Sequence, residues 1–387
     1  MAERRVPATL DNIERVPVLE GEVLDREYIR RGRPVILTGL FDDAPVARLA
    51  DPAVALAELA DLRLPVRANP IPEFVHGRPA PAVRTVRFGA FYRELATRRS
   101  RDFCLEHDTP DALARYIPLP PYLDLGEPDD SWDSHIFMAG PGSATHLHFD
   151  ADKRSVLTHQ VFGRKRYVLI DPRHTRKLAP GTPPGACYAS ALHLDHFSEP
   201  DLAAFLRYVD AWDCILAPGE TLLTPATTWH YVEYVDVALS VTLRLARNRY
   251  LQFLAEALPG TSVELQALAG CFRDEDAVGP AEAAAFAELQ TAALRPFPTA
   301  EARTSVLDML CVELCERLGL DVAGPAYHVA DIQRRDRMAR GVYALDEGSG
   351  GASRSGPGRA RGLGAGWSRA VRRPGRRRAP DSSGPSS

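Results

Sequence analysis

Residues 135–171 read HIFMAGPGSATHLHFDADKRSVLTHQVFGRKRYVLID, and this stretch decides the fold. Short segments rich in β-branched and aromatic residues alternate with glycine, proline and aspartate, which is the pattern of short strands joined by turns. The same pattern continues to residue 248 through ETLLTP, HYVEYV and ALSVTLRLA. Closely spaced short strands are typical of a β-sandwich or barrel. We therefore predict a mainly β core.

Helical patterns flank this core on both sides. Towards the N-terminus, RPVILTGL (33–40) predicts a strand, and apolar spacing predicts helices around 52–62 and 88–98. After residue 248 the apolar spacing becomes helical in YLQFLAEAL, PAEAAAFAELQTAAL and TSVLDMLCVELCERLGL. Pro280 begins the second of these, where a helix tolerates proline. We expect four parts: an N-terminal α/β segment packing on the barrel (1–130), the β core (131–248), a helical C-terminal region (249–346) and a tail (347–387).

Composition points to an ordinary globular protein. Of the 387 residues, 45% are hydrophobic and 25% charged, and no stretch approaches the roughly 18 apolar residues of a membrane span. The N-terminus has no apolar signal region, so we expect a cytoplasmic protein without a membrane partner. Six scattered cysteines without a CxxC pair argue against a disulfide framework and a thiolate zinc site.

Charge is unevenly distributed along the chain. The net charge of −4 divides into +8 for residues 351–387 and −12 for residues 1–350. The tail is rich in Gly, Ser, Arg and Pro, and we expect it to be disordered. The acidic body has no sequence feature of a nucleic-acid-binding surface, so the basic tail is the one candidate region for such binding.

A candidate metal site lies in GPGSATHLHFDAD (140–152). Residues two apart on a strand share a face, so His148 and Asp150 can bind one cation. The best third ligand is His230, which opens a strand after the break at Pro225. Two histidines and one carboxylate leave coordination positions for a chelating co-substrate and O2, which suits a non-haem Fe(II) oxygenase.

Two other histidines, His146 and His193, are alternative candidates for metal ligands. His146 shares the alternation of His148, but a His146/His148 pair would leave Asp150 unexplained. A second H-x-D, at His193 and Asp195, lies among loop and helix-start signals and is interpreted as structural. An H-x-D pair alone is a weak signal.

The ordered combination of motifs resembles the JmjC/cupin-like oxygenases. The matching pieces are G-x-x-T-x-L-H-x-D (142–150), G-R-K-R-Y (163–167) and P-G-E-T-L-x-x-P-x-x-x-W-H (218–230), and the resemblance covers roughly residues 11–248. It implies a double-stranded β-helix, a jelly roll with iron at its mouth. It also implies that His148, Asp150 and His230 are the catalytic iron ligands, and that Thr145 and Lys165 bind the distal carboxylate of 2-oxoglutarate.

The rarity of lysine in this chain is a separate reason to assign Lys165 a binding role. The chain has three lysines against 44 arginines, so a lysine between Arg164 and Arg166 suggests that a compact ammonium is needed there. The alternative is that Lys165 reaches solvent like its neighbours. The chain also departs from the family pattern. The segment between Asp150 and Gly163 is about two residues longer than in the common arrangement of the family, and an asparagine often found in that segment has no clear counterpart here.

These observations predict an Fe(II)- and 2-oxoglutarate-dependent dioxygenase that hydroxylates or demethylates a C–H of a protein or peptide side chain, or of a small metabolite. Three alternatives remain open: a cupin-type metalloenzyme that does not use 2-oxoglutarate, a non-catalytic cupin-like binding module, and a nucleic-acid-associated protein acting through its tail. The C-terminal helices could form a homodimer. Motifs for phosphate loops, serine nucleophiles and H-E-x-x-H zinc sites are absent from the sequence.

Overall fold

The computed structural model describes residues 9–68, 81–98, 100, 102–118, 134–178, 189–190, 192–245, 248–258 and 262–320. The tail predicted to be disordered (347–387) lies outside the described residues. The end of the predicted helical C-terminal region (321–346) also lies outside them.

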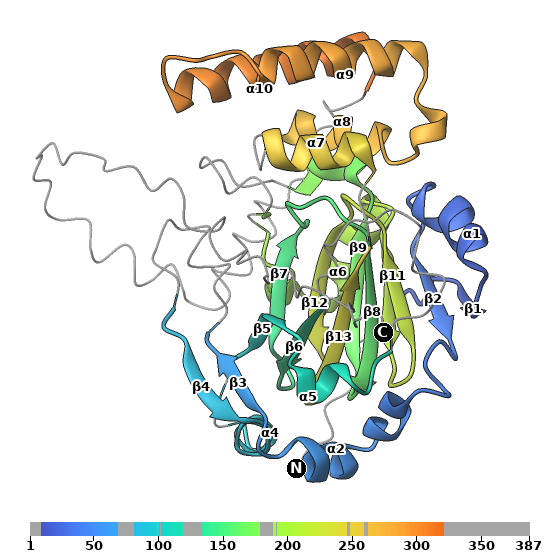
Figure 1. Cartoon of the computed structure of the whole chain (residues 1–387), viewed down its shortest axis with the longest axis vertical. Helices are drawn as coiled ribbons and strands as arrows, with labels where there is room; N and C mark the ends of the chain where they lie inside the picture. The colour runs from blue at the N-terminus through green and yellow to red at the C-terminus, as the bar shows by residue number, and fades with distance from the viewer. Residues whose placement is uncertain are drawn as a thin grey trace, which may run out of the picture. The chain divides into compact units, whose positions relative to one another are not determined.

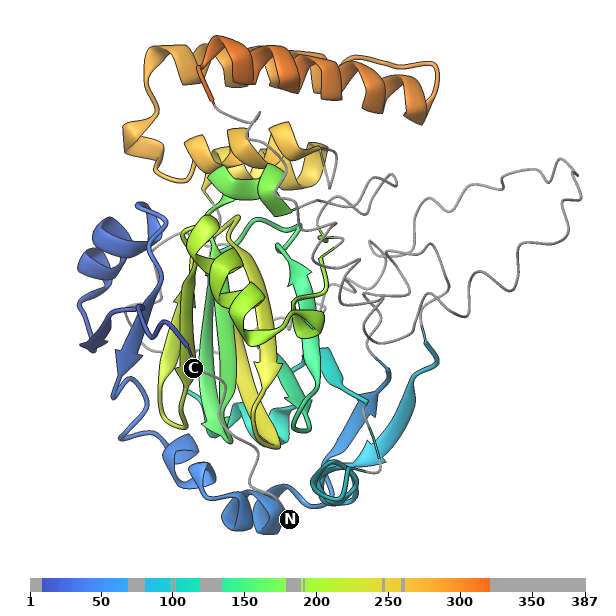
Figure 2. The same ribbon diagram turned by 180° about the vertical axis from the view of Figure 1, so that it is seen from behind.

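Two facing sheets form the core of the protein (Figures 1 and 2). Their strands are β1 (Arg15–Pro17), β2 (Val35–Thr38), β5 (Cys104–Asp108), β6 (Ser134–Ala139), β7 (Ala144–His148), β8 (Val156–Phe162), β9 (Lys165–Ile170), β10 (Trp212–Leu216), β11 (Thr221–Thr224), β12 (Trp229–Tyr234) and β13 (Ala238–Arg244). The larger sheet has the order β1-β2-β11-β8-β13-β6-β5, and the smaller one the order β10-β9-β12-β7. Tyr167 and Leu169 of the smaller sheet pack with Ile36 and Leu222 of the larger one. The prediction of a mainly β jelly-roll core is confirmed.

Gly163 shows why the turn between two strands of the core requires glycine. It joins β8 to β9 with a φ of +66°, and a Cβ at this position would lie 2.2 Å from the carbonyl oxygen of Val237. Only glycine fits both the left-handed backbone and the close approach. The turn brings Lys165 to the first position of β9, so this glycine helps to position a candidate site residue.

The N-terminal part covers the outer face of the larger sheet. Its helices are α1 (Gly21–Leu24), α2 (Pro52–Leu59), α4 (Phe88–Ala96) and α5 (Asp111–Ala114), and β3 (Arg63–Val66) pairs with β4 (Arg84–Arg87). Phe88 and Phe91 are buried with Leu157, Val241 and Leu243 of the sheet. The predicted strand at 33–40 and the helices around 52–62 and 88–98 are confirmed, with slightly shorter bounds.

The outer face of the smaller sheet is covered by α6 (Glu199–Tyr208) and the turn before it. Phe205 and Leu206 of the helix are buried with Val168, Ile170 and Trp229 of the sheet. Polar groups that alternate with these apolar residues along the strands therefore face the space between the two sheets.

Four helices follow the core: α7 (Arg249–Ala257), α8 (Val263–Cys271), α9 (Pro280–Ala293) and α10 (Ala300–Arg317). They share a separate apolar cluster that includes Cys311 and Cys315, and Ala226 of the core also belongs to it. The three predicted helices are confirmed, while α8 was not predicted. Met309 is 73% exposed and Leu294 72% exposed; dimerisation through these helices stays a prediction.

Five of the six cysteines lie among the described residues. Cys104, Cys214, Cys271, Cys311 and Cys315 are all free thiols. Among the described residues, no helix combines the length and the apolar character needed to cross a membrane.

Candidate metal centre

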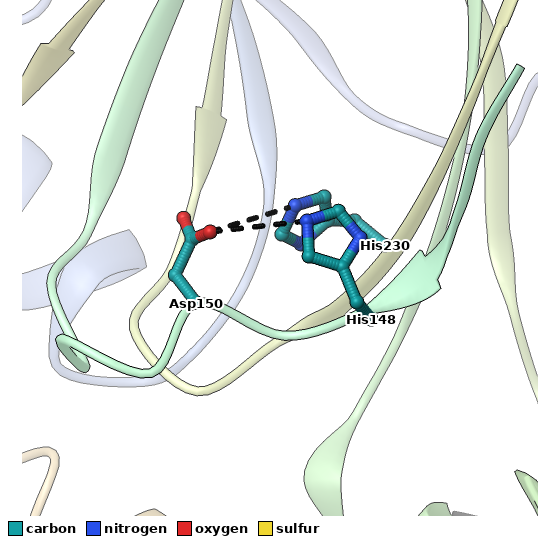
Figure 3. Close-up of side chains that lie close together, drawn as sticks. All are labelled: His148, Asp150 and His230. Atoms are coloured by element: carbon teal, nitrogen blue, oxygen red, sulfur yellow. Dashed lines mark ion pairs between the residues drawn. The ribbon is translucent and has the colours of Figure 1, made fainter. Parts of the chain in front are cut away.

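Strand pairing brings the predicted ligands together (Figure 3). His148 is the last residue of β7, and His230 is the second residue of β12. The two strands are antiparallel neighbours, and His148 lies directly opposite His230. Asp150 follows β7 and turns back towards both rings (Figure 3). Three residues from two distant parts of the chain therefore share one site.

The distances suit a single cation. Oδ1 of Asp150 lies 4.0 Å from Nε2 of His148 and 3.9 Å from Nε2 of His230. The three donor atoms all lie within 4.8 Å of one another. Metal bonds to imidazole nitrogen and carboxylate oxygen are about 2.0–2.2 Å long, so one ion can bridge donors at this spacing with a small inward movement.

Backbone carbonyls orient both imidazoles. Nδ1 of His148 lies 2.7 Å from the carbonyl oxygen of His146, and Nδ1 of His230 lies 3.2 Å from that of Thr228. Because a carbonyl oxygen only accepts hydrogen bonds, each Nδ1 carries the proton and donates it. Each Nε2 then has a free lone pair directed at the site, which is the tautomer that a metal ligand requires.

The protonation states of His148 and Asp150 also favour metal binding. Burial, together with the neighbouring His230, lowers the pKa of His148 to about 3. Burial raises the pKa of the Asp150 carboxyl, but Arg244 and the two histidines outweigh this effect and bring it to about 2. At neutral pH the site thus presents a neutral His148 ring and an ionised carboxylate, the protonation states that bind a divalent cation.

Arg244, the last residue of β13, is a site residue that the sequence interpretation missed. Its Nη1 lies 3.3 Å from Oδ2 of Asp150 and 2.7 Å from Oδ2 of Asp152. The guanidinium thus holds one oxygen of Asp150 while the other oxygen faces the histidines. In β13 the polar residues Ser240, Thr242 and Arg244 alternate with apolar ones in a strand buried throughout. That alternation, visible in ALSVTLR, could have identified Arg244 as facing the interior.

A β-bulge decides which neighbours of His148 face the site. The pairing of β7 with β12 shifts between His148 opposite His230 and Thr145 opposite Val232. Directly opposite residues share a face, so the bulge places Thr145 on the same face as His148 although the two are three residues apart. The ring of His146 instead contacts the ring of His193 and the carbonyl oxygen of Ser190. His146 is therefore not part of this donor set.

Lys165 lies on the same inner face. Its partner on β12 is Tyr234, and Thr145 and Tyr167 both pair with Val232 of that strand. The lysine is 1% exposed, and its Nζ donates to Oγ of Ser240 at 2.6 Å. The Nζ also lies 4.4 Å from the centre of the Tyr234 ring. The alternative that Lys165 reaches solvent is wrong.

Among the described residues, the partners of Lys165 are polar or aromatic and uncharged. Within the part of the chain that the structure describes, its ammonium pairs with no carboxylate. Burial lowers the pKa of Lys165 well below its ordinary value. A buried cation in this setting gains stability when an anion binds beside it.

Arg154 and Ser155 lie in the segment between Asp150 and Gly163 that departs from the family pattern, and both contact neighbouring backbone. Arg154 donates from Nε to the carbonyl oxygen of Leu245 at 2.9 Å and from Nη2 to that of Arg244 at 3.2 Å. Ser155 accepts a hydrogen bond from the backbone of Ala226. Arg154 thus braces the backbone at the end of β13 and thereby supports Arg244, the residue that holds Asp150.

The second H-x-D lies elsewhere. His193 and Asp195 gather with His196 in a turn before α6, where their donor atoms also lie within 4.8 Å of one another. This turn packs on the outer face of the smaller sheet. The two candidate donor sets are therefore separate.

Comparison with known proteins extends these observations. A family model described as "Cupin-like domain" matches residues 21–245. Lysine-specific demethylase 8 from Danio rerio is 31% identical over 133 residues, which is 34% of this chain and 32% of that protein. Lysine-specific demethylase JMJ30 from Arabidopsis thaliana is 27% identical over 165 residues, 41% of this chain and 37% of that protein.

A relative with a different name matches as well. HSPB1-associated protein 1 homolog from Danio rerio is 36% identical over 126 residues, 31% of this chain and 27% of that protein. The matched segments thus span about a third of the length of these curated relatives. The family model, by contrast, covers more than half of the chain and includes all three metal-ligand candidates. The chain belongs to the cupin-like domain family of JmjC type.

Proposed function

We propose that this protein is an Fe(II)- and 2-oxoglutarate-dependent oxygenase, with His148, Asp150 and His230 as the iron ligands. The observation that carries the proposal is the meeting of two imidazole Nε2 atoms and one carboxylate oxygen within 4.8 Å. Two histidines and one carboxylate on one side of an ion leave positions open for a chelating co-substrate and for O2. When bound, iron and 2-oxoglutarate supply the activation of O2, with succinate and CO2 as the co-products.

The protein's own residues hold and orient the reactants. The carbonyls of His146 and Thr228 keep both Nε2 lone pairs directed at the ion. Arg244 holds the second oxygen of Asp150, so a single carboxylate oxygen is presented to the metal. These contacts fix the ligands before the ion arrives, which reduces the ordering that binding requires.

Lys165 and Thr145 support the use of 2-oxoglutarate. Both lie on the inner face that carries the metal ligands, and the Lys165 ammonium has only neutral partners among the described residues. The distal carboxylate of a keto acid chelated at the metal would supply the missing negative charge. A compact ammonium suits this role because the neighbouring Ser240 hydroxyl and Tyr234 ring enclose it closely.

The substrate proposed is an amino-acid side chain of a protein or peptide, with a small metabolite as the second choice. Two of the similar proteins carry the name lysine-specific demethylase. Removal of an N-methyl group and hydroxylation of a carbon begin with attack on a C–H bond, so one site geometry serves both. Hydroxylation is the broader proposal and includes demethylation when the attacked carbon is an N-methyl.

The test is anaerobic reconstitution of the metal-free protein with Fe(II), followed by addition of 2-oxoglutarate. We expect a visible charge-transfer band and, after O2 is admitted, succinate formation. His230→Ala should lose both signals, whereas His174→Ala, which alters a histidine outside either donor set, should keep them.

Two outcomes would contradict the proposal. Iron binding without any spectral change or succinate on addition of the keto acid would favour a cupin-type enzyme that does not use 2-oxoglutarate. Failure of the wild-type protein to bind iron would favour a binding module without catalytic activity.

A further inference from the structure

A second cluster of metal-binding side chains lies in the turn before α6, formed by His193, Asp195 and His196. One donor atom from each residue lies within 4.8 Å of the others. Nε2 of His196 is 3.6 Å from Oδ2 of Asp195. The rings of His193 and His196 lie with their centres 5.0 Å apart. Donors at this spacing suit one metal ion after a small adjustment of side chains.

Apolar anchors hold the backbone of this turn in place. Leu192, Leu194 and Phe197 alternate with the donors in sequence and are buried on the outer face of the smaller sheet. A backbone hydrogen bond from the N–H of His196 to the carbonyl oxygen of His193 closes the turn. The donors are therefore presented by a fixed backbone, so metal binding requires little additional ordering.

The turn is attached to the strand that carries the first site. The N–H of Ser190 donates to the carbonyl oxygen of Leu147, and Ala189 forms a β-bridge with His148. The ring of His193 lies 4.5 Å from the ring of His146 on β7. β7 is the edge strand of the smaller sheet, so residues 189–190 pair with that edge just before the turn.

We infer that His193, Asp195 and His196 bind a second divalent ion of the zinc class, separate from the ion at His148, Asp150 and His230. Imidazole donors select Zn²⁺ and similar transition metals over Ca²⁺ and Mg²⁺, which prefer oxygen ligands. Three protein ligands leave further positions for water, as expected at a turn where Asp195 has a half-exposed side chain. The ion cross-links the turn and stabilises the edge beside β7.

The inference does not depend on the proposed oxygenase activity, and its test counts metal ions. Metal-free wild-type protein, titrated with Zn²⁺ against a chromophoric chelator, should bind two equivalents. The double variant His193→Ala/His196→Ala should bind one, and His148→Ala/His230→Ala should also bind one. Combining all four substitutions should remove both, while His174→Ala should retain two.

Asp195→Asn provides a second test in case the His193→Ala/His196→Ala variant does not fold. The Asp195 side chain is 48% exposed, so replacing it should leave the fold intact. Loss of even an outer partner of a ligand costs about 10–100-fold in metal affinity, so this variant should weaken one of the two equivalents at least tenfold. Zn²⁺ should also raise the melting temperature of the His148→Ala/His230→Ala variant, and adding Asp195→Asn to that variant should reduce the rise.

The titration separates the two claims. A wild-type protein that binds one equivalent, retained in full by His193→Ala/His196→Ala and by Asp195→Asn, overturns the second site. One equivalent that is lost in these variants and kept in His148→Ala/His230→Ala supports the second site while counting against the first.

Discussion

The two H-x-D sequences of this chain, at 148–150 and 193–195, offer the same donor atoms in different structural settings. The first ends strand β7, and its third donor, His230, comes from the neighbouring strand β12. The second lies in a short turn, and its third donor is the next residue, His196. A short pattern therefore identifies available donors, whereas the fold decides what surrounds them.

The residues around the two donor sets differ, and this difference indicates different roles. Around the first, Arg244 contacts the carboxylate, and Lys165 and Thr145 lie on the same inner face. Around the second, buried leucines and a phenylalanine anchor the backbone. An enclosed site with a nearby cation can bind and orient an anionic co-substrate, whereas the second set is presented by an anchored turn in which the Asp195 side chain is half exposed.

Replacing the aspartate of each donor set with asparagine should give the largest difference between the two sets. Asp150→Asn should reduce Fe(II)-dependent succinate formation by more than about 100-fold, because loss of a direct ligand exceeds the 10–100-fold cost of losing an outer partner. Asp195→Asn should leave turnover unchanged. An equal loss in both variants would show that the two sets are not functionally distinct.

Lys165→Met should have the next largest effect. Loss of a charge-assisted hydrogen bond of about 1.5–3 kcal/mol corresponds to a roughly 10–100-fold rise in the KM for 2-oxoglutarate. The ligand-free protein should become more stable by about 1–3 kcal/mol, because the substitution removes a buried cation that pairs with no carboxylate among the described residues.

Lys177→Met is the matched control for this substitution. Lys177 also lies over a tyrosine ring, with its Nζ 4.4 Å from the centre of Tyr208, but it is only partly buried. Steady-state kinetics and urea unfolding should show neither effect. An unchanged KM in Lys165→Met would mean that another residue binds the co-substrate.

Arg244→Met should weaken metal binding at the first site alone, by about 10–100-fold, since Arg244 positions a ligand without being one. Arg244→Lys should restore part of the affinity by keeping the charge. Titration with Co²⁺ and its visible spectrum would report both affinity and geometry. Arg164→Met, which removes a partly exposed ion pair to Asp236, is the control; equal affinities for the Arg244→Met and Arg164→Met variants would exclude a positioning role.

The smallest effect expected is in the pH dependence of stability. Burial lowers the pKa of His148 to about 3, while the unfolded chain keeps the ordinary value of 6.5. Between these values the unfolded state binds the extra proton, so the metal-free protein loses stability as the pH falls from 6.5 towards 3. Urea unfolding at pH 7 and pH 5 should show a smaller loss in His148→Gln than in wild type; equal losses would contradict the assigned protonation state.

Local patterns predicted much of the fold. Alternating apolar residues with Gly and Pro turns marked the strands of the core, and three- to four-residue spacing marked α7, α9 and α10. Helix α8 was missed, and the tail lies outside the described residues. Period-two alternation also paired His148 with Asp150, but Asp150 lies beyond the end of β7 and reaches the site because the chain turns back after the strand.

By itself, the sequence determined the strand-rich core and the residues able to act as ligands, since both follow from local periodicity and side-chain chemistry. Only the tertiary structure decided that His148 lies opposite His230, that a bulge turns Thr145 inward, and that Arg244 reaches Asp150. Strand register and burial arise from contacts between segments far apart in the chain, and no single stretch of sequence contains them. The same is true of the setting of His193, Asp195 and His196, whose turn is anchored by the outer face of a sheet formed elsewhere.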